Sequence, residues 1–348
     1  MTRAGWQIVG LFLLMALSLC ACGRQSPGST PVSGSAGGAE GESAERIVVL
    51  SPAAALMLKD LGLAGRIVGK HDYDLALDGG IPAVGHQEAI DYERLIAVEP
   101  THVVIEWGSR PLPPRLVELA AGHDWMLIKV GLLTLDDIAR TIDDLAITFG
   151  AVSLDTSSPD PPSGIPEDIG SFTASFRFSD PGRRFDIELP SATLARAWSV
   201  RGDGFGSVGP VLLLASSAPP GALGPGSFHH QILLRIGGDS VFADGEGSPW
   251  IELDAEDVLR LDPAAIVLIA PRATGGAAGK EAEPLGAEQI RGRLGRIGSL
   301  DIRAVRDGRL AVIDDPFSLL PSTSMAGFAD RLAEILDIWA AESASKVP

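Results

Sequence analysis

Residues 91–100, DYERLIAVEP, lead into the apolar run THVVI, and residues 254–263, DAEDVLRLDP, lead into the apolar run AAIVL. In both copies an Asp, a Glu two positions later, three apolar positions, a second acid and a Pro fall at identical spacing. An Asp before a short apolar pattern and a Pro after it are typical of the two ends of a helix, and the apolar run that follows is typical of a buried strand. The repetition therefore predicts two similar lobes, each of which presents a carboxylate at the start of a short helix.

The first copy lies in a segment where predicted strands and helices alternate. Ser51 and Pro52 fit the N-cap and the first helical position of a helix that Gly62 ends. This alternation predicts an α/β lobe with a largely parallel sheet over residues 46–150. The predicted strands are 46–50, 66–69, 102–107 and 125–130, and the predicted helices are 51–61, 91–98, 114–121 and 135–149.

The second copy lies in a similar α/β pattern, which predicts a second lobe over residues 210–348. Its predicted elements are a strand at 211–215, a helix that Ser227 caps, the repeat helix and its strand, a strand at 309–313 and a helix at 323–341. Between the lobes, residues 151–209 are predicted to be a connecting segment, and its part 151–190 is rich in proline.

The N-terminus has the pattern of a targeting segment. Arg3 precedes an apolar stretch at 6–19 that is too short for a confident membrane span, and the stretch ends in LCACG. This pattern resembles a bacterial lipoprotein signal over residues 1–22. Cys22 follows the small Ala21 and is the predicted lipidation site, with Cys20 as the alternative site. The segment as a whole can also be interpreted as an uncleaved anchor or as a plain secretory signal. Residues 23–45 are then a flexible tether.

Composition and motifs exclude several functions. A formal net charge of −17 argues against nucleic-acid binding, and the chain's two cysteines both lie in the signal, so the mature body has no disulfide or thiolate metal site. The GFGSVG at 204–209 precedes a predicted strand instead of following one, so a flexible turn is favoured over a dinucleotide site. His229 and His230 are adjacent on a predicted helix and are expected at the surface; the alternative is that one of them faces a cleft. We find no nucleophile elbow, HExxH pair or Walker loop, and predict that the chain is not an enzyme and needs no cofactor.

Glu93 and Glu256 occupy the same position in the two copies and have two interpretations. Each can be a first-turn carboxylate that complements the helix dipole, with Asp91 and Asp254 as the N-caps. Each can also dock onto a basic socket of a partner protein. Helix capping alone does not require a matching Glu in both lobes, so the repetition favours a docking role as well.

Several segments together resemble the periplasmic substrate-binding proteins of ABC importers for vitamin B12, ferric siderophores and haem. The resemblance implies two Rossmann-like α/β lobes joined by a helical connection, with a ligand cleft between them. It also implies that Glu93 and Glu256 engage arginines of the permease, one in each lobe. The resembling segments are 46–54, 61–63 with 68–69, 82–85, the two Glu repeats, 226–229 with 236–244, and 306–310.

The same resemblance implies a set of ligand-binding residues. Tyr73 and Trp250 fall where the family has aromatic residues in the cleft, and Trp107 lies one position beyond the place of another cleft Trp. For the two tryptophans, packing at the lobe edges is the alternative. Gln87 stands where a further cleft Trp is expected, beside His86. Residues 320–323, LPST, replace an expected Arg. His71 or His86 can alternatively be an axial ligand to a metal chelate, or merely a surface residue.

These features predict a lipid-anchored binding component of an importer on the periplasmic side of a bacterial cell envelope. Its ligand is a cobalamin-, siderophore- or haem-type molecule, which can itself be a metal chelate. The expected partners are an ABC importer permease, a small-molecule ligand and the membrane, and the protein is expected to be a monomer. The alternative is an envelope lipoprotein that has the same fold and serves as a sensory or partner-binding module without transport.

Overall fold

The computed structural model describes residues 45–152, 189–202, 204–243, 245, 247–272 and 285–345. The predicted signal with Cys20 and Cys22 lies outside the described residues, as do almost all of the tether and residues 153–188 of the predicted proline-rich insertion.

The N-terminal lobe alternates strands and helices as the sequence predicts. Ser51 caps α1 by accepting a hydrogen bond from the Ala54 amide, and Pro52 is the first helical residue. Thr134 and Asp137 form a capping box at the start of α4. The elements are β1 (Ile47–Leu50), α1 (Pro52–Asp60), η1 (Ala64–Arg66), β2 (Ile67–Lys70), β3 (Gly85–His86), β4 (Ala89–Ile90), α2 (Tyr92–Ala97), β5 (His102–Glu106), α3 (Pro114–His123), β6 (Met126–Val130) and α4 (Leu135–Thr148).

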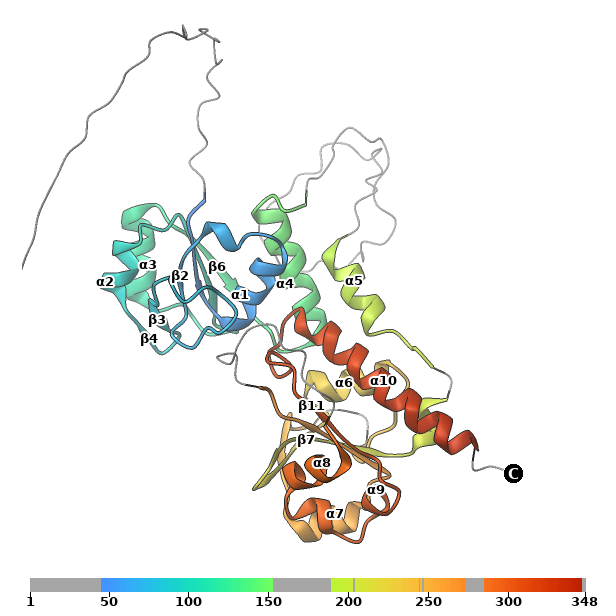
Figure 1. Ribbon diagram of the computed structural model, residues 1–348. Helices are drawn as coiled ribbons and strands as arrows, with labels where there is room; N and C mark the ends of the chain where they lie inside the picture. The colour runs from blue at the N-terminus through green and yellow to red at the C-terminus, as the bar shows by residue number, and fades with distance from the viewer. Residues whose placement is uncertain are drawn as a thin grey trace, which may run out of the picture. The chain divides into compact units, whose positions relative to one another are not determined.

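The sheet of this lobe is parallel, with the strand order β2-β1-β5-β6. Buried side chains on one face pack with α1 and α4, and those on the other face pack with α2 and α3. Figure 1 shows these two helix layers on opposite sides of the sheet. The short strands β3 and β4 form a separate antiparallel hairpin. Two-sided burial explains why β1, with sequence IVVL, is apolar at every position.

The C-terminal lobe begins after α5 (Pro190–Ala197) and repeats this plan with one difference. Strands β11, β10 and β7 are parallel, but β8 and β9 extend the sheet in antiparallel fashion, in the order β11-β10-β7-β8-β9. The elements are η2 (Phe205–Val208), β7 (Val211–Ser217), β8 (Pro220–Leu223), α6 (Phe228–Arg235), β9 (Trp250–Glu252), α7 (Ala255–Leu261), β10 (Ala265–Ile269), α8 (Ala287–Leu294), η3 (Ile297–Ser299), α9 (Arg303–Arg306), β11 (Leu310–Ile313) and α10 (Ser324–Ser345).

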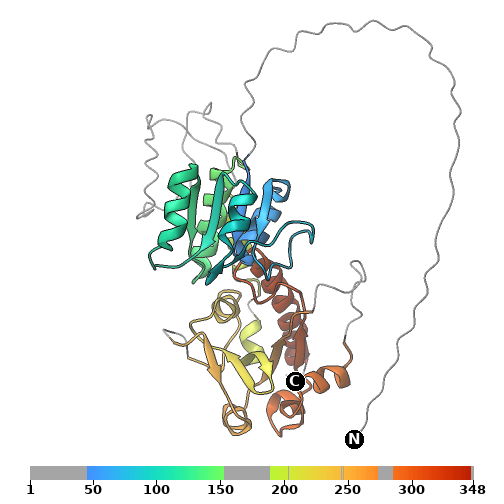
Figure 2. The same ribbon diagram turned by 90° about the vertical axis from the view of Figure 1, so that its left-hand side faces the viewer.

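Helices again cover both faces of this second sheet. Helices α6 and α10 pack on one face, and α7, α8 and α9 on the other (Figure 1 and Figure 2). One cluster of buried apolar side chains includes residues of α1 and α4, of α5, and of α6 and α10. The repeat helices α2 and α7 each lie on the other face of their own sheet, where they belong to separate apolar clusters.

Two features of this lobe differ from what the sequence predicts. Strand β8, which pairs with β7, lies between the predicted strand at 211–215 and the helix that Ser227 caps, where no strand is predicted. The glycine-rich stretch at 204–209 is a turn that precedes a strand, as predicted, and it contains a short 3₁₀ helix whose Phe205 is buried. His229 and His230 are buried instead of exposed. The first turn of α6 is enclosed, and ring contacts with Phe228 and Phe328 offset the cost of burying His229.

Candidate functional site

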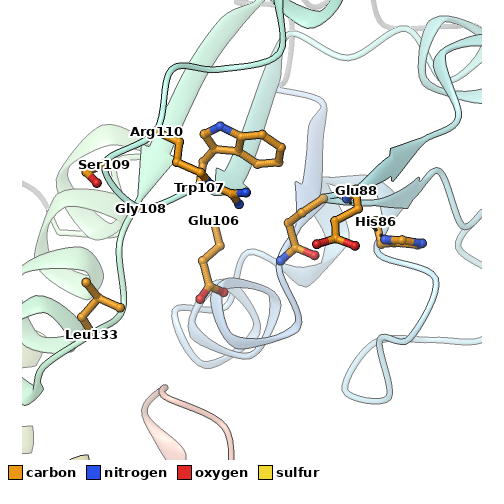
Figure 3. A pocket seen from close by; sticks show the side chains of 9 residues that line it. His86, Glu88, Glu106, Trp107, Gly108, Ser109, Arg110 and Leu133 are labelled. Carbon is orange, nitrogen blue, oxygen red and sulfur yellow. Dashed lines mark hydrogen bonds between the residues drawn. The ribbon is translucent and has the colours of Figure 1, made fainter. Parts of the chain in front are cut away.

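A pocket of about 490 Å³ lies at the carboxyl end of the parallel N-terminal sheet. Its wall comes from the segment 106–110, which starts at the last residue of β5, from Leu133 after β6, and from the hairpin residues 86–88. Figure 3 shows Trp107 and Arg110 on one side of this space, and Glu88 and His86 on another. In open α/β sheets, ligands bind outside the carboxyl ends of the strands, so this position favours a binding site.

Glu106 is held in this pocket by a residue that also starts a helix. The Ser51 hydroxyl donates to Oε2 of Glu106 at 2.7 Å, while its oxygen accepts the Ala54 amide at 3.2 Å. Because Ser51 is buried, this bond fixes the orientation of the carboxylate.

Trp107 is fixed at its polar edge and covered on one face. Its indole N–H donates to the Pro111 carbonyl at 2.6 Å, and the Arg110 guanidinium lies 4.5 Å from the ring centroid. Nζ of Lys129 donates to the Arg110 carbonyl at 3.2 Å. The loop that follows β5 is therefore ordered around the indole.

A second pocket of about 690 Å³ adjoins the first, and the two share Gln87, Glu88, Trp107 and Arg110. Its other walls are more apolar and include Tyr92, the first residue of α2, whose pKa is raised by burial. The remaining lining residues are Ala89, Ile90, Pro111, Leu112, Pro113 and Pro114. Together the pockets offer apolar surface beside a few polar groups, as small-molecule sites commonly do.

His71, Tyr73 and His86 form a cluster of rings beside the first pocket, with centroids 5.6 to 6.0 Å apart. Nδ1 of His71 accepts the Tyr73 amide at 3.1 Å, so its Nε2 carries the proton and donates to Oε1 of Gln87 at 2.9 Å. His71 is buried and both of its nitrogens are engaged, which corrects the view of it as a surface residue. Among the described residues, no group of three or more His, Cys, Asp or Glu is arranged to hold a metal ion.

The five predicted ligand residues do not all come together. His86, Gln87 and Trp107 line the first pocket, whereas the Tyr73 side chain is 71% exposed beside it. Trp250 lies on β9 of the other lobe, is partly exposed, and lines neither pocket.

The Trp250 ring lies against the neighbouring strand β8. A Cβ atom at Gly221 would lie 2.1 Å from the indole, so the ring rests where Gly221 has no side chain. The absence of a side chain at Gly221 is therefore what lets the indole lie against this strand.

Glu93 and Glu256 occupy the same place in the two lobes. Glu93 is the second residue of α2 and Glu256 is the second residue of α7, so one residue separates each Glu from its Asp N-cap. Both side chains are exposed, and neither has a hydrogen bond or an ion pair with another described residue. The N-cap predictions for Asp91 and Asp254 are confirmed.

The repeat continues at the other end of both helices, in a feature the sequence analysis missed. Glu99 and Asp262 have positive φ angles of 44° and 40°, each directly before the proline that ends the repeat. An arginine from another segment then donates to the helix-end carbonyls. Arg46 reaches the Val98 and Glu99 carbonyls at 2.7 and 2.8 Å, and Arg303 reaches the Asp262 carbonyl at 2.9 Å.

These arginines place positive charge at the negative end of each helix dipole. The acid-Pro pair in each copy was the available signal for the helix end. Nothing in the repeat itself identified Arg46 or Arg303, because both lie outside it.

Comparisons with known proteins agree with this architecture. No protein-family model matches the chain. The chain is 40% identical over 74 residues to the vitamin B12-binding proteins of Salmonella choleraesuis (strain SC-B67) and Salmonella typhi. This match covers 21% of this chain and only 24% of each relative, about a quarter of its length.

Solved structures resemble nearly the whole chain. The periplasmic vitamin B12-binding protein BtuF of Vibrio cholerae superposes with a TM-score of 0.52 at 17% identity, over 85% of this chain and 97% of that chain. The periplasmic haem-binding protein RhuT from Roseiflexus sp. RS-1 superposes with a TM-score of 0.53 at 17% identity, over 85% and 99%. In the part of the chain described, no helix is both long and apolar enough to cross a membrane. The similarity to these solved structures confirms the predicted α/β fold class: the chain has the two-lobed fold of these periplasmic binding proteins.

Proposed function

We propose that the chain is the substrate-binding component of an ABC importer, which captures a cobalamin-, siderophore- or haem-type ligand and delivers it to a permease. The observation that carries the proposal is the matched pair Glu93 and Glu256. Two exposed carboxylates, each without an ion pair among the described residues, stand at the same position of equivalent helices. The two-lobed fold and the partial similarity to vitamin B12-binding proteins support it.

In this proposal the ligand binds at the carboxyl end of the N-terminal sheet, and the other lobe completes the binding site. Trp107, Gln87 and His86 contact the ligand from the first pocket, with Tyr73 beside them. Trp250 contributes from the C-terminal lobe. Binding then needs positioning and apolar burial but no catalysis.

Glu93 and Glu256 dock onto basic side chains of the permease, one pair for each lobe. Such pairs give orientation and register more than affinity, because exposed charges gain little free energy in water. Residues 1–22 are the lipoprotein signal in this proposal and Cys22 carries the lipid. Replacing Cys22 by Ala should abolish incorporation of labelled fatty acid, and replacing Cys20 should leave it intact.

The docking role is tested with the double variant Glu93→Lys and Glu256→Lys and the importer's permease and ATPase in proteoliposomes. We expect stimulation of ATP hydrolysis to be lost while ligand affinity stays unchanged. The matched control is the double variant Asp337→Lys and Glu342→Lys, which changes the net charge equally on the exposed side of α10. Undiminished stimulation by the Glu93 and Glu256 variant would rule out docking through this pair.

A further inference from the structure

The first pocket is lined by two carboxylates and one guanidinium. Glu88 and Glu106 supply the carboxylates, and Arg110 supplies the guanidinium. Neither carboxylate has an ion pair with a described residue, and the group that holds Glu106 is the neutral hydroxyl of Ser51. The pocket therefore has an excess of negative charge.

The cations near the pocket are engaged elsewhere. The Arg110 guanidinium lies over the Trp107 ring, and the Lys129 amine donates to a backbone carbonyl. Neither group forms an ion pair with the pocket carboxylates among the described residues. These contacts hold Arg110 and Lys129 in place without neutralising Glu88 or Glu106.

At the corresponding edge of the C-terminal sheet, the described arginine is engaged within its own lobe. Arg272 follows β10, and its Nε lies 3.2 Å from Oδ2 of Asp314, which follows β11.

From these charges we propose that the site selects ligands that carry N–H donors and no anionic group. This inference rests on the proposed function and narrows its ligand class to amide-bearing chelates, against chelates that carry carboxylates or catecholates. An anionic group beside Glu88 and Glu106 is repelled by the two negative charges. Amide N–H groups instead satisfy both carboxylates, which would otherwise lose hydrogen bonds to water when the ligand covers them.

The test compares three probes on the full-length chain: dicyanocobinamide, which carries amides and no anionic side chain; haem, which carries two propionates; and a ferric tris-catecholate. Affinities are measured by quenching of tryptophan fluorescence at low and at high salt. We expect dicyanocobinamide to bind at least about tenfold more tightly than either anionic probe, and high salt to reduce this ratio.

The variants Glu88→Gln and Glu106→Gln, singly and together, keep the side-chain size and remove the charge. The double variant should raise affinity for haem about tenfold and lower affinity for dicyanocobinamide. Glu118→Gln, an exposed acid of α3 that does not line the pocket, should change neither. Circular dichroism checks that each variant is folded.

The outcomes separate this inference from the function it rests on. If an anionic probe binds the natural chain most tightly, or if the ratio does not change in the double variant, charge selection is wrong while the binding function stands. If no probe binds, the proposed function fails and this inference fails with it.

Discussion

Ser51 illustrates, at the scale of single residues, how one side chain links the fold to the site. Its hydroxyl caps α1 and also holds the Glu106 carboxylate at 2.7 Å. The capping role followed from the Ser-Pro pair in the sequence. The contact with Glu106 did not, because it joins residues 55 positions apart and depends on β1 and β5 being neighbours.

His229 is the residue that most clearly departs from what its sequence indicates. Its Nε2 lies 2.7 Å from the Ser318 carbonyl, its ring meets Phe328 edge to face, and burial lowers its pKa to about 4. The unfolded chain takes up a proton near the usual histidine pKa of roughly 6.5, whereas the folded chain does not. Stability is therefore expected to fall as the pH falls from about 6.5 to about 4, and this contribution to stay constant below.

This prediction is checked by urea unfolding of the natural chain and of His229→Gln at several pH values. Gln can still donate to the Ser318 carbonyl but does not titrate. Acidification should therefore lower the free energy of unfolding of the variant less than that of the natural chain, by up to roughly 3 kcal/mol. His123→Gln, at an exposed position of α3, should retain the pH dependence of the natural chain. Parallel pH profiles for the natural chain and His229→Gln would contradict the assignment.

The hairpin β3-β4 is the element that carries His86, Gln87 and Glu88 to the pocket. Gly85 begins it with φ 99°, and a Cβ there would lie 2.3 Å from the Ala89 carbonyl oxygen. We expect Gly85→Ala to lower the free energy of unfolding by on the order of 2–3 kcal/mol and to weaken ligand binding. The control Gly65→Ala, where nothing lies within 4 Å, should be nearly neutral. Equal unfolding midpoints for the two variants would show that the hairpin tolerates a side chain.

The helices α2 and α7 are short, with 6 and 7 residues, and isolated helices of this length are not stable in water. Capping at both ends therefore matters. We expect Arg46→Gln to speed amide hydrogen exchange in α2 several-fold and Arg303→Gln to do the same in α7, each at a cost of about 1 kcal/mol.

The control for the arginine prediction lies on α2 itself. Arg94→Gln removes a charge whose ion pair with Asp91 is exposed, so exchange in α2 should change little. If Arg94→Gln and Arg46→Gln have equal effects, capping of the helix end by Arg46 is not what stabilises α2.

The elements that the sequence predicted well are those with clear end signals. Ser51-Pro52, Ser227 and the two repeat Asp residues mark helix starts, and the runs at 47–50 and 265–269 are apolar throughout because both faces of the sheet are covered. Strands β8 and β9 were missed because PGAL and WIE are short and lack alternation. Strand β8 depends on pairing with β7, and β9 on pairing with β8, which local sequence does not encode.

At the scale of the whole molecule, the predicted site residues divide between the two lobes. His86, Gln87 and Trp107 were chosen through a family resemblance, and their meeting around one pocket depends on tertiary structure. Glu106 and Arg110 were not foreseen, because an acid at a strand end and a loop arginine carry no distinctive pattern. The repeated Glu helix, in contrast, was visible in the sequence because it occurs twice.

The central claim is that this chain binds a large chelate ligand for import. It is tested most directly by titrating the purified full-length chain with cyanocobalamin, cobinamide, haem and several ferric siderophores, and following absorbance and thermal stability. The account predicts that at least one of these ligands binds one to one and raises the unfolding temperature, because a ligand that binds only the folded state stabilises it. Absence of any spectral or thermal shift with every ligand would contradict it.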